Sequence, residues 1–197
     1  MNEQIWWYLA RATGIVAWGL LSISVITGLL VSTRLAKRHP TPAWLLDLHR
    51  FLAGAAVVFT GLHLVGLVAD DYVHFGVADV LVPLASSWRP LAVALGVVAL
   101  YVLAAVELSS LLMRRLPRAV WRMVHVSSFV LFWIATFHFL LAGTDAPNVV
   151  AQWTLDVVMA AVVFLSLVRV LAPRRDPRTS KRPERATTVR AGAQPAT

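Results

Sequence analysis

Four histidines lie in hydrophobic segments long enough to cross a membrane, and they form two pairs. His49 and His63 are 14 positions apart in one segment, and His125 and His138 are 13 positions apart in another. An ionisable side chain in hydrocarbon is costly, which makes it a candidate functional residue by default. Imidazole is also an axial ligand of haem iron. Two matched pairs therefore predict stacked haems that carry electrons across a bilayer.

The segments that must position these histidines are apolar throughout. The chain has 197 residues, of which 58% are hydrophobic and 14% charged, whereas about a quarter of a soluble domain is charged. Since backbone groups in lipid must pair within their own segment, the sequence predicts an all-α integral membrane bundle of five transmembrane helices in a lipid bilayer. The expected spans are Ile5–Val31, Trp44–Ala69, Leu91–Met113, Ala119–Ala142 and Val149–Leu171. The first run lacks the basic start of a signal peptide, so we expect it to be a retained helix.

The distribution of charge predicts how the bundle lies in the membrane. Basic residues follow the first, third and fifth spans, whereas the opposite connections are mostly acidic. The positive-inside rule then places the N-terminus outside and the C-terminus in the cytoplasm, as in a multi-pass protein of the plasma membrane. We expect two parts, a membrane domain over residues 1–171 and a disordered basic cytoplasmic tail over residues 172–197. Because the tail follows a span, its charge suits an anionic leaflet and not nucleic acid.

The expected topology sorts the four histidines into two layers. His49 and His125 lie near the cytoplasmic ends of their spans, and His63 and His138 lie about 20 Å further along the helix axis, near the outer ends. One zinc or dicopper site needs all its ligands within a few ångströms, so two distant layers cannot form one. Two axial pairs on facing helices can. The alternative is that these histidines are polar core residues bonded to neighbouring helices.

The two spacings are not equally simple to explain. Fourteen residues of ideal helix advance by about 1400°, which returns His63 to within about 40° of the face that carries His49. Thirteen residues leave His138 offset from His125 by about 140°. The span with His125 must therefore be tilted, bent or locally irregular, or its haems must lie on either side of its axis.

Two segments resemble the ferric reductase-like transmembrane domain, a superfamily that includes ferric reductases, NADPH oxidases and the haem subunit of the bacterial methionine sulfoxide reductase system. They are LHRFLAGAAVVFTGLH (Leu48–His63) and WRMVHVSSFVLFWIATFH (Trp121–His138). The resemblance covers roughly Arg11–Leu171. It implies two b-type haems per chain, the inner on His49 with His125 and the outer on His63 with His138.

The resemblance has one departure that bears on the electron donor. Ferric reductases and NADPH oxidases normally continue into a flavin- and NAD(P)H-binding domain, whereas no glycine-rich nucleotide fingerprint follows the fifth span here. We therefore expect no flavin or NAD(P)H site in this chain and a separate donor, either a flavoprotein reductase or quinol. The expected acceptor at the outer face is a ferric chelate, oxygen, a quinone or an extracytoplasmic reductase.

Cations near the span ends are candidate partners for haem propionates. Arg50 and Arg122 flank the inner histidines, although positive-inside topology explains them equally well. Arg11 and Arg89 lie on the outer side, against that rule, which favours a binding role. Gly54 and Gly61 are small enough to admit a porphyrin or, more commonly, a neighbouring helix.

Two other functions remain open at this stage. A quinone-linked dihaem cytochrome b that anchors another complex would share the haems but use a different soluble partner. A haem-free scaffold or transport subunit would bind none. Since the sequence names neither donor nor acceptor, it leaves open whether the chain is an enzyme or an electron-transfer subunit of one.

Overall fold

The computed structural model describes residues 4–33, 43–70 and 75–171, all of whose regular structure is helical. Within these residues, five helical spans are long and apolar enough to cross a membrane, as predicted. Their helices are α1 (Ile5–Ser32), α2 (Ala43–Ala69), α4 (Pro90–Leu111), the consecutive pair α5 (Arg118–Val126) and α6 (Ser128–Ala142), and α7 (Val149–Leu171). The predicted tail lies outside the described residues.

Local sequence signals mark where several helices begin. Pro90 stands in the first turn of α4, where its missing N–H breaks no helical bond, and Arg89 before it is left-handed, with φ of 41°. Asn148 caps α7, because its side-chain oxygen accepts hydrogen bonds from the amides of Val150 at 2.9 Å and Ala151 at 3.4 Å. The described part of the loop before α4 contains the short helix α3 (Val77–Leu81).

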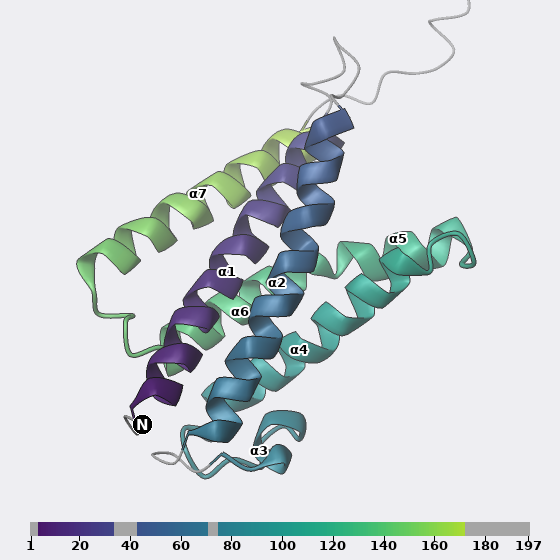
Figure 1. Ribbon diagram of the computed structural model, residues 1–197. Helices are drawn as coiled ribbons and strands as arrows, with labels where there is room; N and C mark the ends of the chain where they lie inside the picture. Colours follow the sequence, from purple (N-terminus) through teal and green to yellow (C-terminus); the bar gives the residue numbers. More distant parts are fainter. Residues whose placement is uncertain (1–3, 34–42, 71–74, 172–197) are drawn as a thin grey trace, which may run out of the picture.

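The helices pack in two pairs that form the frame of the molecule. Figure 1 shows α1 beside α2 and α4 near α6, while α7 meets the C-terminal part of α1 and diverges from the rest of that helix. Gly66 allows α2 to approach α1 closely, since a Cβ atom there would lie 2.8 Å from the Ala10 amide nitrogen. A buried hydrogen bond of 3.1 Å from Trp18 Nε1 to Thr136 Oγ1 joins α1 to α6.

The core lies between α1, α4, α6 and α7, whereas large apolar side chains cover the outside. Its buried clusters are Val25, Leu29, Phe132 and Val162, and Ala99, Leu103 and Leu131. Exposed residues include Phe51, Val58, Leu91, Phe164 and Val170. Such wide apolar exposure is unfavourable in water and natural in lipid, and it agrees with a membrane protein.

Candidate functional site

The four histidines of the two spans meet as two facing pairs. His63 on α2 and His138 on α6 have ring centres 6.4 Å apart and ring planes at 77°. His49 on α2 and His125 on α5 have ring centres 6.1 Å apart and ring planes at 80°. We call the pair His63 and His138 layer A, and the pair His49 and His125 layer B. The two layers thus have nearly the same geometry.

In layer A both imidazoles are anchored by backbone carbonyls of a neighbouring helix. The Nδ1 atom of His63 lies 2.7 Å from the Ala10 carbonyl oxygen on α1, and Nδ1 of His138 lies 2.7 Å from the Ala92 carbonyl oxygen on α4. A carbonyl oxygen can only accept, so each Nδ1 carries the proton and each Nε2 keeps its lone pair. This is the usual state of a histidine that binds a metal through Nε2.

Layer B uses serines as well as a carbonyl. The Nδ1 atom of His49 lies 2.9 Å from the Ser24 carbonyl oxygen and 3.2 Å from the hydroxyl of the same residue. His125 Nδ1 lies 3.5 Å from Ser110 Oγ, which itself donates to the Val106 carbonyl at 2.8 Å. The ring of Trp121 stacks on His125, with ring centres 5.1 Å apart. His125 is therefore held by a hydroxyl and an indole face.

Glycines explain why helix carbonyls can accept these extra bonds. The carbonyl of residue i in a helix already accepts the amide of residue i+4, and a side chain at i+4 crowds its second lone pair. Three histidines contact a glycine at that i+4 position. A Cβ atom would lie 2.9 Å from His63 at Gly14, 3.1 Å from His49 at Gly28, and 2.7 Å from His138 at Gly96. Each distance is too short for a rigid ring to tolerate easily.

The anchors repeat between the two halves of the bundle. In α1 the glycines Gly14 and Gly28 are 14 positions apart, the spacing of the histidines that they face on α2. In α4 the corresponding positions, also 14 apart, are Gly96 and Ser110, which face the histidines on α6 and α5. The sequence revealed no such repeat, because it lies in spacing and not in residue identity. The 14-residue spacing of Gly14 and Gly28, equal to that of His49 and His63, is the sequence signal that could have revealed this repeat.

A break at Ser127 resolves the 13-residue spacing of His125 and His138. The amide of Ser127 donates to the Val124 carbonyl, three residues back, at 3.1 Å, and four-residue bonding resumes where Leu131 donates to Ser127 at 2.9 Å. A three-residue turn winds more tightly than an α-helix and so reduces the angular offset between the two histidines. A local irregularity, one of the alternatives left open for this span, is thus present between α5 and α6.

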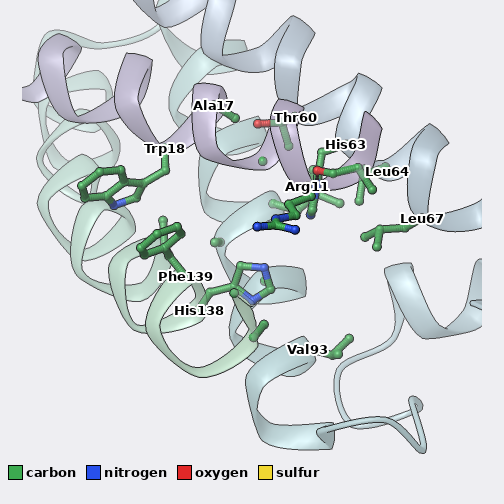
Figure 2. A pocket seen from close by; sticks show the side chains of 18 of the residues that line it. Arg11, Ala17, Trp18, Thr60, His63, Leu64, Leu67, Val93, His138 and Phe139 are labelled. Atoms are coloured by element: carbon green, nitrogen blue, oxygen red, sulfur yellow. Dashed lines mark hydrogen bonds between the residues drawn. The ribbon is translucent and has the colours of Figure 1, made fainter. Parts of the chain in front are cut away.

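Layer A opens on a cavity of about 210 Å³. Figure 2 shows His138 turned toward the side of the cavity where His63 and Arg11 lie, with Trp18 and Phe139 stacked beside it. The lining is mostly apolar, and Arg11 and Asp145 supply its charged groups. It resembles ligand sites in general, which are apolar with a few placed polar groups.

The four predicted arginines have different surroundings. Arg11 forms a two-point ion pair with Asp145, which follows α6, and this bond and charge hold the pKa of Asp145 below its ordinary value. Arg89 donates to the Leu141 carbonyl at 2.7 Å. Arg50 contacts only the neighbouring carboxylate of its own helix among the ion pairs of the described residues. Arg122 is exposed. Arg11 alone of the four lines the cavity.

Two residues that sequence reasoning did not assign lie near layer B. Arg169 on α7 donates to Ser32 at 2.8 Å, one helical turn beyond Gly28, which faces His49. Ser110 contacts His125 directly. Conversely, a Cβ atom at Gly54 or Gly61 would meet no atom within 4 Å, so the expected close packing of another helix at these glycines is absent from the described structure.

The pair distances can be compared with what a shared metal requires. A metal–imidazole bond is about 2.0 Å long and the nitrogen is about 1.1 Å from the ring centre, so two imidazoles on opposite sides of one metal have ring centres about 6.2 Å apart. The observed 6.1 and 6.4 Å agree with this value. Within the described residues, no three histidine or carboxylate side chains group closely enough to hold a metal ion by themselves. The histidines therefore fit a metal that brings its own equatorial ligands.

Comparisons with known protein families, with curated proteins and with solved structures found no match. The fold established here is a bundle of apolar helices with five candidate membrane spans.

Proposed function

We propose that this protein carries electrons across a membrane through two b-type haems, one held by each histidine pair. The observation that carries the proposal is the state of the layer A imidazoles. Both donate Nδ1–H to a helix carbonyl at 2.7 Å, which leaves the lone pair of each Nε2 free, and the two ring centres are 6.4 Å apart. A polar core histidine needs no partner ring at that separation, whereas an axial ligand pair does.

The equal geometry of the two layers supports two carriers and not one. Layer B repeats the ring separation of layer A within 0.3 Å, on the same helix α2 and the same span of α5 and α6. When bound, a bis-histidine haem supplies a one-electron carrier without an open coordination position. The residues of this chain orient the imidazoles, and in layer A the backbone carbonyls also fix their tautomers.

Arg11 is the best placed partner for a haem propionate in layer A. It lines the cavity, and Asp145 uses its Nε and Nη2 atoms, which leaves Nη1 for a second anionic group. Arg89 binds a backbone carbonyl nearby and is the second candidate there. For layer B we keep Arg50 and Arg122 as candidates and add Arg169, which binds Ser32 one helical turn beyond Gly28.

The distribution of charge suggests the membrane orientation, and the resemblance suggests the direction and the partners of transfer. With the N-terminus outside and the C-terminus in the cytoplasm of a plasma membrane, layer A is the outer layer and layer B the inner one. The two histidine segments resemble the ferric reductase-like transmembrane domain, in which electrons leave at the outer face. A separate flavoprotein reductase or quinol would reduce layer B, and a ferric chelate or an extracytoplasmic reductase would oxidise layer A.

The decisive test is the haem content of the purified protein. We expect a dithionite-reduced spectrum of a low-spin b-type cytochrome and a pyridine haemochrome assay that gives two haems per chain. Protein that is folded by its helical content and binds no haem b would overturn the proposal. Reduction by quinol, compared in membranes with reduction by a flavin reductase, then separates a quinone-linked cytochrome b from a reductase-linked one.

A further inference from the structure

Ser110 stands where the other three histidine anchors have glycine. Gly14, Gly28 and Gly96 each let a histidine approach the carbonyl four residues earlier, and Ser110 is the fourth member by spacing, 14 positions after Gly96. Its side chain fills the space that the other three leave open. One ligand of layer B is consequently held in a different way from the remaining ligands.

The hydroxyl of Ser110 lies between the imidazole and the carbonyl that would otherwise hold it. Ser110 Oγ donates to the Val106 carbonyl at 2.8 Å, so it can accept from His125 Nδ1, which is 3.5 Å away. In the corresponding place of layer A, His138 reaches the Ala92 carbonyl directly at 2.7 Å. A contact of 3.5 Å is at the limit of hydrogen bonding. The anchor of His125 is thus the weakest of the four.

The strength of the hydrogen bond at His125 Nδ1 affects how basic the imidazole of His125 is. A strong hydrogen bond from Nδ1–H to a carbonyl raises the basicity of the imidazole, and outer hydrogen bonds of this kind tune the metal. A more basic axial ligand stabilises the more highly charged ferric iron, which lowers the reduction potential. A weak bond to a hydroxyl has less of this effect.

We propose that Ser110 is a positioning residue that weakens the hydrogen bond of His125 and so raises the reduction potential of the haem in layer B above the value that glycine would give at this position. The inference rests on the proposed function, since it needs a haem on His49 and His125. It concerns a residue that does not contact the iron and acts only through His125.

The test is a spectroelectrochemical titration of the full-length, haem-loaded protein in detergent, with all variants measured at the same pH. Ser110→Gly should let His125 bond to the Val106 carbonyl, and one of the two midpoint potentials should become more negative while the other is unchanged. Because Ser109 Oγ also donates to that carbonyl, at 3.0 Å, a second variant adds Ser109→Ala and should enlarge the shift. Ser110→Ala removes the acceptor and should shift the same potential in the opposite direction.

Two variants separate this effect from a general structural one. Ser110→Thr keeps the hydroxyl and should retain the wild-type potentials. Ser22 bonds back to the Trp18 carbonyl at 2.7 Å in the core of α1, as Ser110 does to Val106, so Ser22→Gly is the matched control and should move neither potential. Shifts of opposite sign for Ser110→Gly and Ser110→Ala are not expected from loosened packing.

The failures are distinguishable. A wild-type protein without haem overturns the proposed function and this inference together. A wild type with two haems whose potentials do not move in Ser110→Gly or in Ser110→Ala overturns the inference alone. Shifts of the same sign in both variants, or an equal shift in Ser22→Gly, would show that Ser110 acts through packing and would also overturn it.

Discussion

The two histidine layers differ in their anchors although their ring geometry is nearly the same. In layer A both Nδ1 atoms bond to backbone carbonyls at 2.7 Å, and both carbonyls belong to continuous helices. In layer B the bonds are longer and involve serine hydroxyls, and the helix that carries His125 ends one residue later, at Val126. Layer A is therefore the more rigidly prepared of the two sites.

The difference between the layers shows how the type of hydrogen-bond acceptor determines how firmly a helix bundle holds an imidazole. A backbone carbonyl cannot rotate away, so layer A holds its imidazoles without relying on a side-chain rotamer. A serine hydroxyl rotates, and the turn at Ser127 leaves the end of α5 freer to adjust. We therefore expect layer A to tolerate changes in its glycines poorly, and layer B to adapt to changes of the same kind.

The largest expected effect comes from removing one ligand in each layer separately. His138→Leu should abolish the haem of layer A, and His125→Leu that of layer B, so that each variant binds about one haem per chain. The pyridine haemochrome assay measures the content, and a redox titration identifies the potential that is lost. If the two variants lost the same potential, or if either bound no haem while remaining helical, the assignment of one pair to each haem would be wrong.

A smaller effect is expected from filling the space beside a ring. An added Cβ atom at Gly96 would lie 2.7 Å from His138, and at Gly28 3.1 Å from His49. Gly96→Ala should weaken haem binding in layer A by about tenfold or more, the lower end of losses caused by outer-shell changes at metal sites, and Gly28→Ala should weaken layer B less. Haem retention during dilution in detergent measures both.

Gly19→Ala is the matched control for these two variants. Gly19 lies in the same helix as Gly28, and nothing lies within 4 Å of a Cβ atom at this position. It should keep both haems and gain slightly in stability, since alanine favours helix more than glycine does. Equal losses of haem affinity in Gly96→Ala and Gly28→Ala would contradict the expectation that layer A is more rigid than layer B.

The sequence predicted the spans because each is a long apolar run, and the helices match within about two residues at their ends. The sequence was a poorer guide to the glycines that let backbone carbonyls anchor the histidines. A glycine in a membrane helix has several common uses, so Gly54 and Gly61 attracted attention through their place beside the histidines, whereas Gly14, Gly28 and Gly96 lie on other helices. Only the packing of α1 on α2 and of α4 on α6 identifies which glycines face a ring.

The sequence showed that the 13-residue spacing of His125 and His138 does not fit an ideal helix, but it did not predict that the helix breaks at Ser127. Ser127 and Ser128 are compatible with a continuous helix, and no proline or glycine marks the break. Among the arginines, charge alone ranked Arg11 and Arg89 equally. The structure separates them because Asp145, which lies 134 positions from Arg11, reaches the same end of the bundle. Such long-range pairs depend on the fold and not on local sequence.

A further prediction compares ion pairs beside the two layers. Arg11 and Asp145 join α1 to the segment after α6 at the cavity, whereas Arg50 and Asp47 are an exposed pair within α2, at 3.5 Å. Asp145→Asn leaves the charge of Arg11 uncompensated near layer A and should make that potential more positive, by up to about 59 mV, a tenfold change for one electron. Asp47→Asn should change neither potential measurably, because exposed pairs contribute little.

The smallest expected effect is the pH dependence of the same pair. The hydrogen bond and charge of Arg11 hold the pKa of Asp145 below its ordinary value of 3.8. A depressed pKa means that the pair contributes its full stabilisation above the unfolded-state pKa and loses it as the pH falls through the lower, folded-state pKa. Layer A should therefore show an extra positive shift in potential as the pH falls through the lowered pKa of Asp145 in the wild type, and no such step in Asp145→Asn. A step of equal size in both proteins would arise from groups other than Asp145, and would end the assignment of this pair to layer A.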